Sequence, residues 1–183
     1  MINNPILGLK NGFPNGMEWT QSNITSGNIF SVYNANGIWV AGSNSGLYYS
    51  TDGKTWTKSN LTSGHFQVVY NANGIWVAGC GSQDNKGLYY SEDGKTWTQS
   101  NVTSGTFTSV YNANGVWVAA GDNKSGLYYS EDGKTWTQSN VTGKPFGCVY
   151  NANGVWVAGS TSTAKAYGLY YSDDGKTWTQ SNV

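Results

Sequence analysis

Short runs of apolar and aromatic residues alternate with polar turn residues along the whole chain. The run at 127–130 reads LYYS and the run at 135–137 reads TWT, and both are rich in the aromatic or β-branched residues that favour strands. Asp132 and Gly133 lie between these two runs, and an Asp-Gly pair in that place is a strong hairpin signal. The pattern therefore predicts two short strands that are joined by a tight turn.

The chemistry of this turn is also readable from its residues. Gly133 can take a positive φ at no steric cost, and the carboxylate of Asp132 can accept hydrogen bonds from backbone amides ahead of it. The hydroxyl of Ser130 can add a bond across the turn. The same acidic residue recurs in each repeat, so we expect a structural turn role for Asp52, Asp93, Asp132 and Asp174.

A second phrase predicts a second hairpin in each repeat. It reads VYNANG, followed by Ile or Val, then Trp and Val, and it begins at Val32, Val69, Val110 and Val149. Its central pair is expected at Asn-Gly, which suits the tightest hairpin turns. In the third repeat the expected strands are one that ends at Tyr111, and then 116–119, 126–130 and 134–139.

The repeats have a regular period. The twelve letters YSEDGKTWTQSN at 129–140 recur unchanged at 90–101, with one difference at 171–182 and two at 49–60, and a half copy, WTQSN, begins at Trp19. The Trp of this phrase lies at 19, 56, 97, 136 and 178, which gives a period of about 40 residues with four short strands. That period is typical of a β-propeller blade, and a blade needs neighbours to cover both its faces.

The motif S-x-D-G-K-T-W resembles the Asp-box, the turn motif of sialidase-type and related propellers. It has one residue fewer between Asp and Trp than the usual form. The combination with NANG-[IV]-W-V also resembles repeats of phage tail and bacterial surface proteins. The resemblance covers four repeats, and it implies an all-β propeller fold while saying little about function.

We therefore expect a single domain over 1–183 with four complete four-stranded blades. The repeats are expected at about 28–60, 65–101, 106–140 and 145–182, and a degenerate hairpin at 1–27 would form an N-terminal half-blade. Two arrangements remain open. Four blades could close a ring within one chain, with the hairpin as an appendage, or blade completion between chains could build a homo-oligomer.

Composition narrows the functional classes. The formal net charge is zero, 11% of the residues are charged, and the chain has no Arg. A basic surface for nucleic acid is therefore not expected. No long apolar segment predicts membrane insertion, and no signal peptide is visible at the start, although an extracellular or virion-associated role stays open. Cys80 and Cys148 hold unlike positions in the repeat and are expected to be free thiols that fill small apolar spaces.

Catalysis is not expected. Sialidases hold the substrate carboxylate with arginines, which this chain lacks, and its repeated acids have the positions of turn residues. His65, the only histidine, has no partners for a catalytic triad. The loops at 81–86 and 121–124 each offer one Asp, too few for a calcium site. We expect no metal and no cofactor.

The expected function is non-catalytic, lectin-like binding of carbohydrate at repeated weak sites. Sugars are held by aromatic faces and by Asn, Asp and Ser hydrogen bonds, and repetition would add avidity. The loops between the second and third strands differ between repeats, so we place the ligand on the face that carries them. The candidate ligand-binding residues are Trp39, Trp76, Trp117, Trp156, Asn44, Asp84, Asn85, Asp122, Asn123 and Tyr167.

Two other functions remain open at this point. The chain could be a structural or attachment module of a phage tail or surface adhesin, with a protein ligand or none. The near-identity of the repeats also fits an amplified or engineered repeat scaffold without a selected ligand.

Overall fold

Four antiparallel sheets, each of four strands, make up the part of the chain that the structure describes. This computed structural model describes residues 20–81, 86–122, 125–161 and 168–182. The first sheet contains β1 (Ile29–Ala35), β2 (Ile38–Ser43), β3 (Gly46–Ser50) and β4 (Thr57–Lys58), and the second contains β5 (Phe66–Ala72), β6 (Ile75–Gly81), β7 (Lys86–Ser91) and β8 (Thr98–Gln99). The third contains β9 (Phe107–Ala113), β10 (Val116–Gly121), β11 (Leu127–Ser130) and β12 (Thr137–Gln138), and the fourth contains β13 (Phe146–Ala152), β14 (Val155–Ser160), β15 (Leu169–Ser172) and β16 (Thr179–Gln180).

Each sheet is one blade, and its strands pair in the order of the sequence. In the third blade Val116 pairs with Ala113 and Val118 pairs with Tyr129, so the two hairpins share β10. This order confirms the all-β propeller fold that the period of the repeat predicts. No helix of the described residues is long and apolar enough to cross a membrane.

The Asn-Gly turns have the backbone that their residues predict. Asn114 has a φ of 51° and Gly115 a φ of 82°, and the other three blades repeat this pair of positive values. Two successive positive φ angles are the mark of a type I′ turn, whose twist matches the twist of the strands on either side. Asn tolerates this conformation better than other residues with a side chain, because its short amide can bond locally.

The outermost strand of each blade is shorter than expected. We predict a strand over 134–139, but β12 covers only Thr137–Gln138. The amides of Lys134 and Thr135 donate to the Asp132 carboxylate instead, and the amide of Trp136 donates to the side chain of Asn101. Side chains therefore replace the ladder bonds of the first part of this strand.

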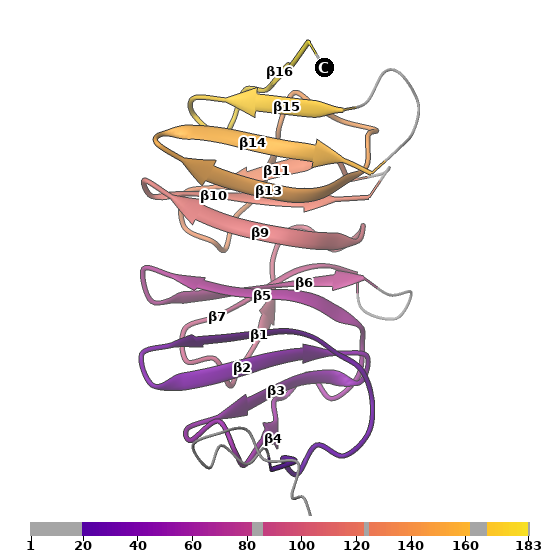
Figure 1. Cartoon of the computed structure of the whole chain (residues 1–183), viewed down its shortest axis with the longest axis vertical. Helices are drawn as coiled ribbons and strands as arrows, with labels where there is room; N and C mark the ends of the chain where they lie inside the picture. The colour runs from indigo at the N-terminus through magenta and orange to yellow at the C-terminus, as the bar shows by residue number, and fades with distance from the viewer. Residues whose placement is uncertain (1–19, 82–85, 123–124, 162–167, 183) are drawn as a thin grey trace, which may run out of the picture.

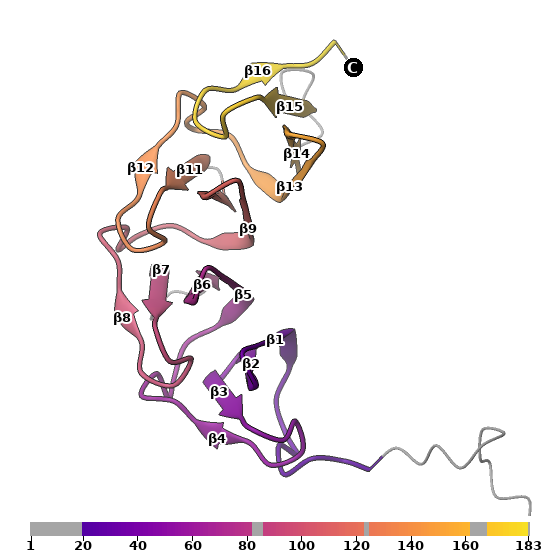
Figure 2. The same cartoon turned by 90° about the vertical axis from the view of Figure 1, so that its left-hand side faces the viewer.

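The four blades stack side by side along an open arc (Figures 1 and 2). Figure 2 shows β1, β5, β9 and β13 along the inner side of the arc, with β4, β8, β12 and β16 along its outer side. The first and last blades lie at opposite ends. Four blades therefore do not close a ring within this chain. The expected N-terminal hairpin falls mostly on residues 1–19, which lie outside the described residues.

The core consists of three apolar clusters, one between each pair of neighbouring blades. The middle cluster joins Val77 and Leu88 of the second blade to Phe107, Val110 and Trp117 of the third. Equivalent residues of the repeat form the other two clusters. Each blade therefore presents two different apolar faces, one to the blade before it and one to the blade after it.

A row of tyrosines follows the inner strands from blade to blade. The ring centroids of Tyr33 and Tyr70 are 4.9 Å apart, those of Tyr70 and Tyr111 are 5.3 Å apart, and those of Tyr111 and Tyr150 are 4.7 Å apart. Burial raises the pKa of Tyr70, and the neighbouring Tyr33 and Tyr111 raise it further. Tyr70 therefore remains neutral at ordinary pH, and its ring packs between those of Tyr33 and Tyr111.

The two cysteines differ in their surroundings. Both are free thiols, and Cys80 is buried in the cluster between the first two blades, as expected for a small apolar filler. Cys148 is exposed, which corrects that expectation for the second thiol. It pairs with Gly159 beside a register shift that follows Phe146, where the strand is irregular.

Candidate functional site

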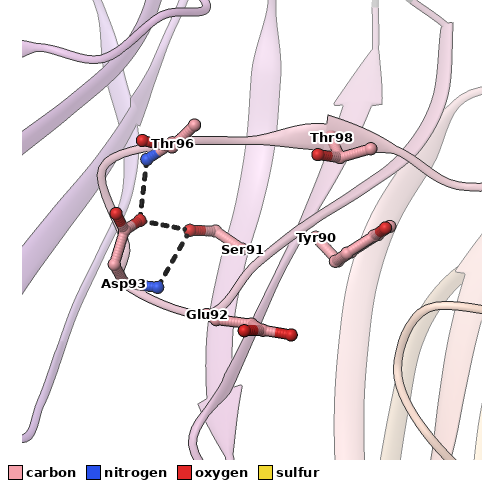
Figure 3. A pocket seen from close by; sticks show the side chains of 6 residues that line it. All are labelled: Tyr90, Ser91, Glu92, Asp93, Thr96 and Thr98. Atoms are coloured by element: carbon pink, nitrogen blue, oxygen red, sulfur yellow. Dashed lines mark hydrogen bonds between the residues drawn. The ribbon is translucent and has the colours of Figure 1, made fainter.

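The turn between the third and fourth strands of each blade is held by one serine and one aspartate. In the second blade, Ser91 Oγ donates to Asp93 Oδ1 over 2.9 Å and accepts from the amide of Gly94 over 2.9 Å. Asp93 Oδ1 also accepts from the amides of Lys95 and Thr96 over 2.8 and 2.7 Å. Figure 3 shows the hydrogen bonds that join Asp93 to Ser91 and Thr96. The other blades repeat these bonds around Asp52, Asp132 and Asp174.

These hydrogen bonds keep the aspartates ionised. The amides of Thr55 and Lys54 lower the pKa of Asp52 to about 2 from its ordinary value of 3.8. At Asp93 and Asp132, burial acts to raise the pKa, but the amide hydrogen bonds outweigh it and the pKa is lowered. An oxygen that accepts three hydrogen bonds has little capacity left for a ligand, so Oδ1 of each of these carboxylates serves the turn.

A shallow groove runs beside this turn in three of the blades. In the second blade its volume is about 410 Å³, and its lining includes Tyr90, Glu92 and Thr98 (Figure 3). In the third blade the volume is about 480 Å³, and in the fourth about 260 Å³. Their linings repeat the same positions, with Tyr129, Glu131 and Thr137 in one, and Tyr171, Asp173 and Thr179 in the other.

A lysine from the next blade lies at the edge of the groove. Lys176 lines the groove of the third blade, forms an ion pair with Glu131 and lies over the ring of Tyr129 at 5.7 Å from its centroid. Lys134 makes the same ion pair with Glu92 of the second blade. The groove therefore offers one aromatic ring, one ion pair and threonine hydroxyls. This combination suits an uncharged polar ligand with several hydroxyl groups.

The groove is poorly equipped for acid-base catalysis. A general acid needs a carboxyl that keeps its proton near neutral pH, yet the aspartate of each turn has a lowered pKa. Glu92 is exposed and paired with Lys134. Among the described residues, no group of three or more His, Cys, Asp or Glu side chains could hold a metal ion. The side chains that line the groove can form hydrogen bonds and offer a ring for stacking.

The structure buries most of the tryptophans that the sequence suggests for ligand stacking. Trp76, Trp117 and Trp156 are buried in the clusters between the blades, and their rings have no free face for a ligand. Trp39, in the first blade, is partly exposed. The reason is the stacking of blades, because each buried ring packs against the blade before its own, and no blade precedes the first one in the part of the chain that the structure describes.

The polar candidates on the loop face are scattered. Asn44 Oδ1 accepts from the amide of Asn28 over 3.1 Å and so ties its loop to the segment before β1. Asp122 Oδ1 accepts from the hydroxyl of Ser125 over 2.8 Å and so holds its own loop. Asp84, Asn85, Asn123 and Tyr167 lie outside the described residues. The structure does not bring Asn44 and Asp122 together, because they belong to the first and third blades.

Sequence reasoning missed the groove residues. Tyr90, Glu92 and Thr98 all belong to the phrase that is repeated almost unchanged, which we read as turn and strand chemistry alone. The alternation of inward and outward side chains along that phrase could have indicated them. Residues on one side of a short strand point outward, and at Thr98, Thr137 and Thr179 they carry the same hydroxyl in three blades.

Comparisons with known proteins agree with the fold. No protein-family model matches the chain, and no curated protein matches it. The computationally designed Ika8 protein is similar in structure, with a TM-score of 0.61 and 10% identity over 80% of this chain and 46% of that one. An ancestral GH74 enzyme gives a TM-score of 0.63 with 18% identity over 83% of this chain and 24% of its own.

YCF48, in a structure with a D1 peptide bound, is a third similar protein. Its TM-score is 0.55, with 16% identity over 84% of this chain and 52% of the YCF48 chain. This chain thus spans about half or less of the length of these three proteins. At such identities the likeness concerns the fold, which β-propeller enzymes and non-enzymatic β-propellers share.

Proposed function

We propose that this chain is a non-catalytic binding module that holds carbohydrate in the grooves beside its Ser-Asp-Gly turns. The observation that carries the proposal is the recurrence of one groove in three blades, with a tyrosine, an acid and a threonine at the same positions each time. Sugars present hydroxyl groups and C–H faces, and this lining has a partner for each. Similar shallow grooves in neighbouring blades favour a ligand that itself repeats.

Avidity is the reason why weak grooves can suffice. A groove of a few hundred Å³ that is open to solvent buries little of a ligand, so each contact is expected to be weak. A polysaccharide or a glycan-coated surface can occupy several grooves at once, and the effective concentration of the second contact then raises the overall affinity. The proposal therefore predicts a preference for polymeric or clustered glycans over free monosaccharides.

The decisive measurement is binding of the purified chain to arrayed and soluble oligosaccharides. We expect binding of clustered glycans that falls by more than about tenfold when Thr98, Thr137 and Thr179 are all replaced by valine, since each lost hydrogen bond costs about 0.5–1.5 kcal/mol. Valine keeps the branched shape and the strand preference of threonine, so the blades should remain folded.

The matched control replaces Thr62, Thr103 and Thr142 by valine, since these are exposed threonines at one repeated position outside the grooves. Their loss should leave binding unchanged. If no glycan binds the intact chain at millimolar concentration, or if the control weakens binding as much as the groove variant, the proposal fails.

A second candidate function is a scaffold without a small ligand, or one that binds a protein. The likeness to a designed protein and to a propeller with a bound peptide favours this alternative. The same array separates the two functions, because a scaffold would show no glycan binding that depends on Thr98, Thr137 and Thr179.

A further inference from the structure

The first blade exposes a face that every later blade buries. Val32 is 48% exposed and Trp39 is 38% exposed, whereas Val69 and Trp76, at the same positions of the second blade, are 3% and 2% exposed. Ile29 of this face is exposed as well. These positions pack against the preceding blade elsewhere in the arc, so among the described residues the first blade lacks only such a neighbour.

The last blade exposes the opposite face of the repeat. Val157 is 41% exposed and Leu169 is 44% exposed, whereas Val118 and Leu127, at the same positions of the third blade, are fully buried. Tyr150, at the end of the tyrosine row, is 58% exposed. This face packs against the following blade in every other repeat.

The two exposed faces are complementary, because they are the two halves of an interface that the chain already makes three times. In the cluster between the third and fourth blades, Val118 and Leu127 meet Phe146, Val149 and Trp156. Val157 and Leu169 are the counterparts of the first pair, and Ile29, Val32 and Trp39 are the counterparts of the other three residues. The last blade of one copy can therefore pack on the first blade of another without any new kind of contact.

Charges at the rim of the two faces match in the same way. Lys134 pairs with Glu92 of the blade before it, and Lys176 pairs with Glu131 in turn. Lys54 of the first blade and Asp173 of the last blade occupy the corresponding positions, and no ion pair holds either of them in the described part of the chain. Lys54 of one copy and Asp173 of another are therefore the cation and the anion that could form the same ion pair at a contact between copies.

The Asn–Trp hydrogen bonds between neighbouring blades are compatible with a contact between two copies. In the later blades the Asn that ends one repeat binds the backbone of the next Trp, as Asn60 does with Trp97. At the first blade, Asn23 already makes these two bonds with Trp56. The letters TQSN occur both at 20–23 and at 179–182, so either segment can supply the clasp at a contact between copies.

From this complementarity we propose that a second copy of this chain docks head-to-tail, so that the face of Val157 and Leu169 on each copy covers the face of Val32 and Trp39 on the other. Two such contacts join two arcs into one ring of eight blades. Two is the smallest number of copies that can close the open arc of Figure 2 into a ring. Large exposed apolar faces seek partners, and this one has a partner of matching shape in the chain itself.

The experiment measures molar mass by light scattering over a wide range of concentration. We expect the intact chain to reach the mass of two chains. The variants Val32→Glu and Val157→Lys should each remain single chains, because each spoils both contacts of a ring. Both positions are exposed in the single chain, so neither substitution buries a charge there, and circular dichroism should show an unchanged fold. Thr103→Glu and Thr103→Lys, at an exposed position, are the controls and should behave like the intact chain.

Mixing the two variants distinguishes head-to-tail docking from other arrangements. A Val32→Glu chain keeps an intact face on its last blade, and a Val157→Lys chain keeps one on its first blade, so an equal mixture should regain the mass of two chains. The proposal is overturned if the intact chain stays single, if either variant alone still pairs, if the mixture stays single, or if the mass grows beyond two chains with concentration.

Discussion

Asn101, at the end of the second blade, clasps the backbone of Trp136 in the third. Its Oδ1 accepts from the Trp136 amide over 2.8 Å, and its Nδ2 donates to the Trp136 carbonyl over 2.9 Å. A side-chain amide thus imitates one rung of a strand ladder between two separate sheets. This clasp fixes where the fourth strand of one blade lies relative to the blade before it.

The clasp leads to a prediction about stability. Asn101→Ala leaves the amide and the carbonyl of Trp136 without these partners, and we expect a loss of about 1–3 kcal/mol in the free energy of unfolding, measured by denaturant melts. Asn182 has the same position in the last repeat, and no described blade follows it, so Asn182→Ala is the matched control. It should change little in the Val32→Glu background, where no second copy docks. Equal losses for the two variants would contradict this role of the clasp.

A second prediction compares two leucines that share one position in the repeat. Leu127 is fully buried between blades, and Leu169 is exposed at the end of the arc. Leu127→Ala should cost about 2–5 kcal/mol, as buried leucines do, whereas Leu169→Ala should cost less than about 0.5 kcal/mol in a single chain. Both are best measured in the Val32→Glu background, where docking of a second copy cannot bury Leu169. Similar costs for the two substitutions would mean that the ends of the arc are covered in some other way.

A third prediction concerns the lock of the Ser-Asp-Gly turn. Asp132→Ala removes the acceptor of two backbone amides and one hydroxyl, so we expect a loss of about 1–2 kcal/mol in denaturant melts. Asp132→Asn keeps an acceptor oxygen without the charge and should cost less. A change below about 0.3 kcal/mol for the alanine variant would argue against the lock.

A fourth prediction concerns pH. The pKa of the turn aspartates is lowered in the folded chain, and that of Asp52 lies at about 2 against an ordinary 3.8. A lowered folded-state pKa gives stability that is complete above the unfolded value and is lost as the pH falls through the folded one. The melting temperature should therefore hold down to about pH 4 and then decline towards about pH 2. A melting temperature that stays constant to about pH 2 would show that these hydrogen bonds do not depend on ionisation.

The sequence predicts the local structure well because the turns carry their own chemistry. Asn114 with Gly115, and Asp132 with Gly133, specify their hairpins through residues next to each other in the chain. The order of four strands then follows from hairpins that share a strand. The length of β12 could not be predicted, because it depends on Asn101, which comes from the preceding blade and competes for the amide of Trp136.

The closure of the ring and the location of the site were harder to predict. Closure depends on the angle between successive blades, which many side chains such as Val110 and Trp117 set together. The ligand role proposed for Trp76 requires an accessible ring, but stacking buries that ring on the preceding blade. The groove around Tyr90 and Thr98 forms only when the strand and the turn come together, so its residues read as ordinary strand positions in the sequence.

The open arc has a consequence for how the chain unfolds. Each blade touches only the blades before and after it, so its stability is the sum of its own term and of the terms for those neighbours, as in a one-dimensional array. The two central blades have two neighbours and the terminal blades have one. In a single chain, such as the Val32→Glu variant, the terminal blades should therefore open first, and amide protons in β5, β6, β9 and β10 should exchange with solvent more slowly than those at the same positions of β1, β2, β13 and β14. In a closed ring every blade has two neighbours, so this difference in exchange rate between central and terminal blades should disappear. Hydrogen exchange therefore distinguishes an open arc from a closed ring in solution.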